Sequence, residues 1–286
     1  MLKIAITGST GLVGSRIQEL LYKDFSFIPL LQSHVDITDA VSVKDFVDKN
    51  DFDIMLHLAG YTNVDQAEKE RDLCEQINVT GTENVFNATK DKGKKFIYIS
   101  TDFVFDGKNP PYFEDSDPNP IGWYAKTKYE GERIIKDDGM IVRISYPYRA
   151  IFDQKKDLVR GIKSHLEDGN KLTMITDVMI TPTFIDDVAF SLKHLFTNFS
   201  NEIFHIVGSE SYTPYETALK IAQAFKLNDS LIGKSTYDEF YKGNKIRSKK
   251  SVIKSKKNNF WKMKSLDEGL KIIRDQIPQK SAAEGQ

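Results

Sequence analysis

The chain is poor in cysteine and has neither a long apolar run nor the pattern of a secretory leader. Its single cysteine, Cys74, excludes an internal disulfide framework and a cysteine-based zinc site. No stretch of about 18 uninterrupted apolar residues occurs, so no membrane span is predicted. The first residues run directly into a short apolar segment that ends in glycine, without the basic and long apolar phases of a signal peptide. We therefore expect a cytoplasmic protein.

An excess of either charge is also missing, since 40 Lys and Arg face 41 Asp and Glu. A net charge of -1 argues against a nucleic-acid-binding protein and favours a small-molecule ligand. One segment departs from this balance, because residues 242–264 hold ten Lys or Arg and no Asp or Glu. Composition leaves two interpretations of this segment open: a solvated surface loop, or a cationic wall for a phosphate-bearing ligand.

Short apolar runs alternate with longer amphipathic patterns through the first half of the 286 residues. Strands that are separated by helix-sized segments predict crossover connections and a parallel sheet. The predicted strands are 3–7, 26–31, 54–59, 95–100 and 140–144, and the predicted helices are 12–22, 41–49, 64–76, 80–92 and 124–136.

The pattern loosens after Ser145. The stretches "TPYE" from Thr213 and "SLDE" from Ser265 are typical capping boxes and predict two helix starts. The last residues, 281–286, are small and polar, so a flexible tail is expected there. Two further helices are predicted at 158–167 and 185–197, and a strand is predicted at 203–207.

The stretch "TGSTGLVG" follows the first predicted strand and opens the first helix. It supplies Gly8, Gly11 and Gly14, which let the backbone turn tightly and approach a pyrophosphate. The amides at a helix N-terminus favour the negative charge of that group. The sequence therefore predicts a dinucleotide site on a Rossmann-type, doubly wound parallel sheet of the α/β class, with a smaller C-terminal substrate-binding lobe.

This fold class predicts a division of the chain. We expect residues 1–148 to form the dinucleotide-binding domain, with the strand and helix of 184–208 returning to it. Residues 149–183 and 209–280 are expected to form the substrate-binding lobe.

The end of the second predicted strand does not decide between the two nicotinamide cofactors. An acidic residue there would favour NAD and an Arg would favour NADP, but the chain has neutral Gln32, Ser33 and His34. Asp36 lies slightly beyond, where a loop can meet the adenine or the ribose. NADP and NAD both remain possible cofactors.

Two further loops are expected at the carboxyl edge of the sheet, where open α/β sheets bind ligands. Ala59 and Gly60 follow the third predicted strand, and their small size permits close packing against a cofactor. Simple steric need at a strand end is the alternative explanation. In the stretch "NVTGT", Asn78 is expected to cap the next helix.

Three polar side chains in the middle of the chain can together move a proton. Tyr124 and Lys128 are one helical turn apart, so an ammonium group near the phenol is expected to favour the phenolate. Thr101 follows the fourth predicted strand and can donate a second hydrogen bond to a carbonyl oxygen. Beside the glycine loop, this set predicts hydride transfer from a nicotinamide to a ketone, with Tyr124 donating the proton.

Several stretches of the chain resemble one family. "TGSTGLVG" is similar to the cofactor loop of the extended short-chain dehydrogenase/reductases. "AGYTNVDQAE", "INVTGTENV", "STDFVFDG" and "PNPIGWYAKTKYEGE" resemble, in the same order, stretches of the dTDP-4-dehydrorhamnose reductases within that group. The resemblance is closest over residues 1–145 and continues through "VRISYPY", "TPTFIDDVA" and "IRSKKSVIKSKK".

The resemblance assigns roles to particular residues. It implies catalytic roles for Thr101, Tyr124 and Lys128, and substrate contacts from Thr101, Asp102, Tyr146 and Arg247. Together with the glycine loop it predicts a cofactor site formed by Gly8, Gly11, Leu12, Val13, Gly14, Asp36, Ile37, Ala59, Gly60, Tyr61, Tyr124 and Lys128. The chain departs from the family where Tyr146 replaces a Trp, Arg149 replaces a Gly and Ser248 replaces a Pro.

The activity that the resemblance implies is NAD(P)H-dependent reduction of the 4-keto group of a nucleotide-linked 6-deoxysugar. The expected substrate is dTDP-4-dehydrorhamnose, and the expected pathway is dTDP-rhamnose biosynthesis. Two alternatives stay open: a sugar-nucleotide epimerase or dehydratase of the same fold, and a non-catalytic, cofactor-binding regulatory subunit. A nucleotide sugar is the expected partner, without nucleic acid, membrane or metal site, and the chain is expected to be a monomer or a homodimer.

Overall fold

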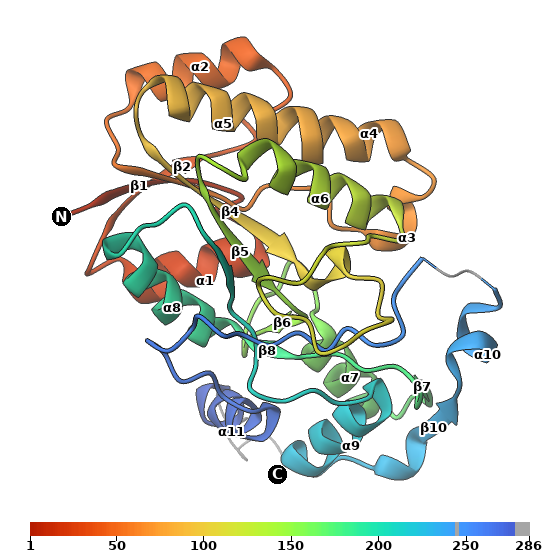
Figure 1. Cartoon of the computed structure of the whole chain (residues 1–286). Helices are drawn as coiled ribbons and strands as arrows, with labels where there is room; N and C mark the ends of the chain where they lie inside the picture. The colour runs from red at the N-terminus through yellow and green to blue at the C-terminus, as the bar shows by residue number, and fades with distance from the viewer. Residues whose placement is uncertain (244–245, 278–286) are drawn as a thin grey trace.

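A six-stranded parallel sheet lies at the centre of the computed structural model, which describes residues 1–243 and 246–277 (Figure 1). Its strand order is β2-β1-β3-β4-β5-β9, so the order reverses between β1 and β3. The parallel pairing of all neighbours confirms the predicted α/β class. The strands are β1 (Lys3–Thr7), β2 (Ser26–Leu30), β3 (Ile54–His57), β4 (Lys95–Thr101), β5 (Met140–Ile144) and β9 (Ile203–His205).

Helices cover both faces of this sheet, because successive side chains of a strand point to opposite sides. Ile4 and Ile6 of β1 pack in one cluster with α1 and α8, whereas Ala5 packs in a second cluster with α2, α5 and α6 (Figure 1). Burial of one Ile or Leu side chain contributes about 1.5–3 kcal/mol, so both layers stabilise the sheet. The helices are α1 (Leu12–Leu21), α2 (Ala40–Lys49), α5 (Gly81–Asp91), α6 (Trp123–Ile135) and α8 (Ile185–Thr197).

The sequence predicts one continuous helix over 64–76, and this prediction is wrong because the structure has two short helices there. Acidic side chains at the interruption bond to other segments. Glu68 accepts a hydrogen bond from the backbone N–H of Trp123 at 2.5 Å, and Glu70 accepts one from the hydroxyl of Tyr61 at 2.5 Å. These contacts tie the interruption to α6 and to the loop after β3. The two pieces are α3 (Val64–Ala67) and α4 (Arg71–Glu75).

Asn78 does not cap a helix, contrary to the expectation from the sequence. It lies inside a one-turn π-helix, η1 (Gln76–Thr80), through which α4 continues into α5. The side chain is buried and turns toward the loop after β3, where its Oδ1 accepts from the N–H of Tyr61 at 2.7 Å. The need of that loop for a hydrogen-bond acceptor outweighs the local capping preference. Single π-turns of this kind are frequent at functional sites.

A smaller lobe lies below the sheet (Figure 1). Its helices α7, α9 and α11 enclose a separate core that includes Ile162 and Ile221. Both capping boxes predicted at Thr213 and Ser265 are confirmed. The tail predicted over 281–286 lies outside the described residues. The elements are α7 (Leu158–Glu167), α9 (Pro214–Phe225), α10 (Tyr237–Tyr241) and α11 (Leu266–Gln276), with the strand pairs β6 (Pro147–Tyr148) and β8 (Thr183–Phe184), and β7 (Leu172–Ile175) and β10 (Ile232–Ser235).

The part of the basic segment over 246–264 crosses from the lobe to the sheet domain, and we call it the basic strap. Isolated β-bridges join it to both parts, since Lys250 pairs with Met179 and Ile253 pairs with Tyr112. Five of its described cations have acidic partners elsewhere in the chain, so the strap is more than a solvated loop; its interpretation as a cationic wall for a phosphate-bearing ligand stays a prediction. The ion pairs are Arg247–Asp65, Lys249–Asp238, Lys256–Asp115, Lys257–Glu202 and Lys264–Asp187.

The part of the chain that the structure describes has neither a membrane-spanning helix nor a cluster of metal-ligating side chains. None of the helices there combines the length and the apolarity that crossing a bilayer requires. No three His, Cys, Asp or Glu side chains within 1–243 and 246–277 gather as ligands for a metal ion.

One ion pair is fully buried and connects α6 to the centre of the sheet. Arg143 of β5 donates to both carboxylate oxygens of Glu132 in α6, at 2.9 and 2.6 Å. Both side chains are at most 3% exposed, so each charge depends on the other for compensation.

Replacement of Glu132 by Gln is expected to lower the free energy of unfolding by about 3 kcal/mol, because it leaves the buried Arg143 cation without a charged partner. Urea denaturation measures the change. Glu130→Gln is the matched control, since Glu130 pairs with Arg133 on the exposed side of the same helix. It should change stability by no more than about 0.5 kcal/mol. Equal, small effects of both substitutions would contradict the role given to the buried pair.

Candidate active site

The glycine loop forms a cradle for an anion at the carboxyl end of β1. Gly8 has a φ of +64°, which favours glycine. A Cβ on Gly14 would lie 2.3 Å from the carbonyl oxygen of Gly8, so α1 approaches β1 more closely than a side chain allows. Gly11 precedes α1 without a capping side chain, which leaves the amides of Leu12 and Val13 available at the positive end of the helix. The loop therefore fits a diphosphate.

The loop after β3 is held by a chain of hydroxyl and imidazole groups that the sequence analysis missed. Thr7 Oγ1 accepts hydrogen bonds from the backbone N–H groups of Leu58 at 3.1 Å and Ala59 at 3.0 Å. It also lies 2.8 Å from His57 Nδ1, and His57 Nε2 lies 3.1 Å from Thr82 Oγ1. Burial lowers the pKa of His57 to about 3, so the ring is neutral and structural. A histidine inside an apolar strand is the signal that could have revealed this role.

Asn78 joins the same loop to α6. Its Nδ2 donates to the carbonyl oxygen of Tyr61 at 3.2 Å and to Thr127 Oγ1 at 3.0 Å. The Thr127 hydroxyl donates in turn to the carbonyl oxygen of Tyr124 at 3.0 Å. Gly60 lies between these groups, since a Cβ there would be 3.0 Å from Asn78 Oδ1. The structure thus brings the predicted cofactor loop next to the helix that carries the predicted proton donor.

Thr101 and Tyr124 meet at the carboxyl end of β4. Thr101 is the last residue of that strand, and Tyr124 lies in the first turn of α6. Burial raises the pKa of Tyr124 above its ordinary value, although a hydrogen bond with the Thr101 hydroxyl opposes this effect. The phenol therefore stays protonated at neutral pH, which is the state that a proton donor needs.

The pKa of Tyr124 is raised and not lowered, contrary to the expectation from its spacing to Lys128. The Lys128 ammonium group donates to the carbonyl oxygen of Ile99 at 2.9 Å and lies 4.0 Å from the centre of the Tyr98 ring. Burial lowers the pKa of Lys128 to about 7, so much of its charge is lost near neutral pH. Removal from water dominates the ionisation of both Tyr124 and Lys128, and it disfavours the charged form of each.

Asp102 and Tyr146 border the same site from two other segments. Asp102 Oδ1 lies 3.3 Å from Thr101 Oγ1, and its Oδ2 accepts a hydrogen bond from Ser251. Tyr146 has a φ of 39°, in the left-handed region of backbone conformation. Large residues seldom adopt this conformation, and residues that do are frequent at functional sites. The Phe103 ring, 6.1 Å from the Tyr146 ring, fills the space beside them.

Arg247 forms a bidentate salt bridge with Asp65 at the edge of this site. Its two terminal nitrogens donate to the two carboxylate oxygens at 2.6 and 2.8 Å. The Arg247 side chain is 17% exposed, whereas that of Asp65 is 67% exposed. The cation lies 5.4 Å from the centre of the Tyr241 ring and opposes the rise in the pKa of Tyr146. Arg247 therefore reaches the predicted substrate side while it is held by α3.

The loop after β2 carries the remaining predicted cofactor contacts. Asp36 is exposed, and its Oδ1 accepts from the N–H of Thr38 at 2.9 Å and from its hydroxyl at 2.8 Å. The carbonyl oxygen of Ile37 accepts from Asn84 Nδ2 at 3.0 Å, which fastens the loop to α5. This end of the site is apart from the Thr101–Tyr124 pair and faces solvent.

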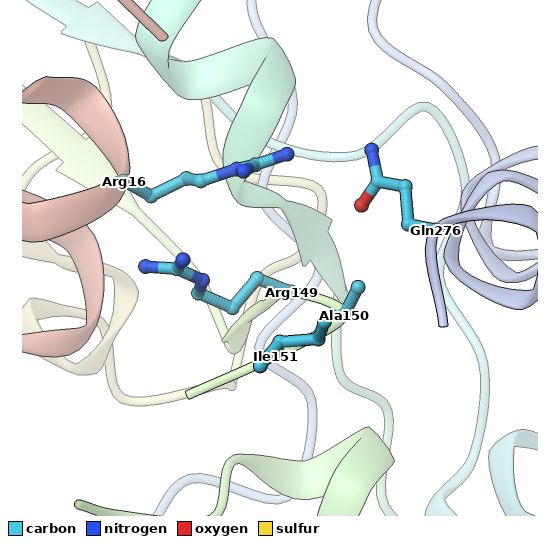
Figure 2. A pocket seen from close by; sticks show the side chains of 5 residues that line it. All are labelled: Arg16, Arg149, Ala150, Ile151 and Gln276. Atoms are coloured by element: carbon cyan, nitrogen blue, oxygen red, sulfur yellow. The ribbon is translucent and has the colours of Figure 1, made fainter. Parts of the chain in front are cut away.

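Arg149, which departs from the family pattern, bonds to α1. Its guanidinium donates to both carboxylate oxygens of Glu19, at 2.8 and 2.6 Å, and to Ser15 Oγ at 2.9 Å. Figure 2 shows it beside Arg16, whose own guanidinium pairs with Asp186 at 2.7 Å. The charge of each arginine is thus balanced by a carboxylate. A cavity of about 240 Å³ lies here, lined by Arg16, Arg149, Ala150, Ile151 and Gln276.

A tyrosine and a lysine one turn apart, opposite a glycine cradle on a doubly wound sheet, are the arrangement of the extended short-chain dehydrogenase/reductases, and the fold is of that class. The comparison with family models narrows the assignment. The chain belongs to the family described as RmlD substrate binding domain, whose model matches residues 2–274.

Known relatives include enzymes and a subunit of an enzyme. The chain is 30% identical over 250 residues to the probable low-salt glycan biosynthesis reductase Agl14 of Haloferax volcanii, covering 80% of this chain and 82% of that protein. It is equally 30% identical to the methionine adenosyltransferase 2 subunit beta of Bos taurus, covering 80% and 73%. The crystal structure of dTDP-4-dehydrorhamnose reductase from Bacillus anthracis, in complex with NADP, has a TM-score of 0.89 and 30% identity, covering 97% of this chain and all of that one.

Removal of the Lys128 ammonium should change how stability depends on pH. Burial lowers the pKa of Lys128 from 10.5 to about 7, so between these values the unfolded chain binds a proton that the folded protein lacks. The free energy of unfolding should therefore rise from about pH 7 to about pH 10 in the wild type, and this rise should be reduced in Lys128→Met.

Urea denaturation of the protein without cofactor, at a series of pH values, measures this difference. Lys126→Met removes an exposed lysine of the same helix and should keep the wild-type pH dependence. The account of Lys128 fails if the two variants give the same curve.

Proposed function

We propose that this chain reduces the 4-keto group of a nucleotide-linked 6-deoxysugar with NADH or NADPH, and that its substrate is dTDP-4-dehydrorhamnose. The observation that carries the proposal is the position of Tyr124 in the first turn of α6, next to Thr101 at the carboxyl end of β4. A ketone oxygen placed between them would accept a hydrogen bond from each, and it would take the proton of Tyr124 as negative charge develops. The likeness to the reductase from Bacillus anthracis supports this substrate class.

The cradle and the loops of the sheet edge would hold the dinucleotide. When bound, the reduced nicotinamide supplies a hydride to the ketone carbon. The amides of Leu12 and Val13 would bind the diphosphate in the space that Gly8, Gly11 and Gly14 leave open. Asp36 and Ile37 would meet the adenosine end, and Ala59, Gly60, Tyr61 and Lys128 would border the nicotinamide end. Residues 1–148 and 184–208 would thus form the cofactor-binding part.

The substrate would lie between this edge and the lobe of 149–183 and 209–280. Thr101, Asp102 and Tyr146 would contact the sugar, since they surround the predicted position of its ketone. Arg247 would bind the diphosphate, because a guanidinium fork matches phosphate oxygens as well as it matches the carboxylate of Asp65. A nucleotide diphosphate would therefore compete with Asp65 for Arg247.

A second candidate is a regulatory subunit that binds the cofactor without turnover. It is favoured by the 30% identity to the methionine adenosyltransferase 2 subunit beta, which equals that to the glycan biosynthesis reductase. Such a protein would bind NADPH or NADH but would leave every nucleotide keto-sugar unreduced. The retained cluster of Thr101, Tyr124 and Lys128 supports the reductase.

Substitution of Tyr124 by Phe should lower kcat by about 10²–10⁴-fold, since it removes the proton donor and keeps the ring. The assay follows oxidation of NADPH or NADH by dTDP-4-dehydrorhamnose. Tyr129→Phe, a change on the same helix, is the control and should keep wild-type turnover. Turnover that survives Tyr124→Phe would overturn the assignment of Tyr124, and cofactor binding without any turnover in the wild type would favour the regulatory subunit.

Opposite shifts in KM are expected from the two partners of the Arg247–Asp65 pair. Arg247→Met should raise KM for the nucleotide sugar by about 10–100-fold, because charge-assisted hydrogen bonds to the diphosphate are lost. Asp65→Asn weakens the competing carboxylate and should lower KM, with little change in kcat for either variant. A rise in KM for both variants would show that the ion pair supports the site instead of competing with the substrate.

A further inference from the structure

Residues 149–157 connect β6 to α7 across the carboxyl edge of the sheet, and we call them the crossing loop. At its start, the Arg149 guanidinium bonds to α1, and its Nη1 lies 3.4 Å from the carbonyl oxygen of Leu12. Near its other end, Lys155 Nζ donates to Thr62 Oγ1 at 3.2 Å. Leu12 follows β1 and Thr62 follows β3, the two strands between which the strand order reverses. The crossing loop therefore spans the crevice in which doubly wound sheets bind dinucleotides.

A guanidinium from α7 fixes the backbone of the crossing loop. Arg160 donates to the carbonyl oxygens of Phe152 and, at 2.6 Å, of Lys155. Asp157 balances this cation, since it accepts from Arg160 Nε at 2.8 Å, and it also accepts from the backbone N–H of Arg149 at 3.2 Å. The Arg160 and Asp157 side chains are 11% and 2% exposed, so the base of the loop is held by a pair that is largely removed from water. A loop with a fixed backbone loses little freedom when it binds a ligand.

The Lys155 ammonium is an exposed cation near the end of this loop. An ammonium group has three donors, and the neutral Thr62 hydroxyl takes one of them. Within 1–243 and 246–277, no ion pair joins Lys155 to a carboxylate, in contrast to the five paired cations of the basic strap. A phosphate oxygen accepts a stronger hydrogen bond from an ammonium group than a neutral hydroxyl does, so Lys155 is available for a phosphate.

The glycine cradle faces the same crevice from α1. Its amides at Leu12 and Val13 are suited to a diphosphate, but the stretch 7–14 contains no Lys or Arg. The diphosphate of a dinucleotide is anionic, and the cradle offers it only the partial charges of the backbone. A cation from the crossing loop would balance part of this charge from the side opposite the cradle.

We propose that Lys155 exchanges the Thr62 hydroxyl for an oxygen of the dinucleotide diphosphate, and that the crossing loop thereby closes the crevice over the bound cofactor. The proposal rests on the cofactor site of the proposed function. A nucleotide sugar also carries a diphosphate. Thr62 directly follows Tyr61, which is predicted to border the nicotinamide end, and for this reason the cofactor is the ligand assigned to Lys155.

The test measures binding of NADH and NADPH by calorimetry, without turnover. Lys155→Met should raise Kd for the preferred cofactor about 10-fold, because a charge-assisted hydrogen bond is lost. It should also weaken the dependence of Kd on salt, and Lys155→Arg, which keeps the cation, should restore most of the affinity. ADP-ribose, which has the diphosphate without the nicotinamide, should show the same loss. Lys156→Met is the matched control and should keep the wild-type Kd, since Lys156 is the neighbouring exposed lysine and donates to Ser164 of α7 at 2.7 Å.

Amide hydrogen exchange gives a second readout. At saturating cofactor, exchange over 150–156 should slow in the wild type and in Lys156→Met, and it should slow less in Lys155→Met at equal occupancy.

Equal Kd values for the cofactor in Lys155→Met and Lys156→Met would overturn the role of Lys155. A loss of affinity confined to dTDP, measured in parallel, would overturn it as well, because the contact would then belong to the nucleotide sugar. Absence of cofactor binding in the wild type would overturn the proposal together with the cofactor site. Cofactor binding that depends on Lys155, without reduction of any nucleotide keto-sugar, would support the proposal and overturn the reductase function instead.

Discussion

The buried amide of Asn78 is the contact on which the geometry of the site depends. It satisfies the backbone of Tyr61 on one side and the hydroxyl of Thr127 on the other. The loop after β3 and the helix α6 are thereby fixed relative to each other. A buried amide that loses its partners costs about 1–3 kcal/mol per group, so this arrangement is held more firmly than a surface contact.

Exclusion of water gives this site its acid–base character. Burial is the largest cause of three pKa shifts: it raises the pKa of Tyr124, brings the pKa of Lys128 down to about 7 and brings the pKa of Asp102 up to about 6. In each of these three groups removal from water disfavours the charged form, so one physical cause shifts the ionisation of a phenol, an ammonium group and a carboxyl group. The neutral His57 beneath the loop after β3 follows the same rule but serves only to hold the backbone.

Much of the fold follows from local patterns, because the hydrophobic periodicity of strands and helices and the capping boxes depend only on residues that are close together in the sequence. The helices that begin after Thr213 and Ser265 are confirmed for this reason. The glycine cradle could also be predicted from the sequence. The spacing of its glycines reflects the close approach of Gly14 to the carbonyl oxygen of Gly8, which leaves no room for a side chain.

Contacts between distant segments could not be predicted in this way. The partner of Arg247 is Asp65 of α3, and the partner of Asp102 is Ser251 of the strap; no local pattern joins either pair. An Asn at a predicted helix start favours a cap, but the hydrogen bond that Asn78 accepts from the Tyr61 backbone decides its place. The direction of the shift in the pKa of Tyr124 does not follow from spacing either, because spacing indicates a nearby lysine but not the extent to which the phenol is removed from water.

The central claim is that this site transfers a hydride to the ketone carbon of a nucleotide sugar. The most direct measurement uses reduced nicotinamide that carries deuterium at the transferred position, in each stereochemical form, and locates the label in the product sugar by NMR spectroscopy. The account predicts one deuterium on the former ketone carbon from one of the two forms. Product sugar without deuterium from either form, with the label retained on the nicotinamide in both experiments, would contradict it.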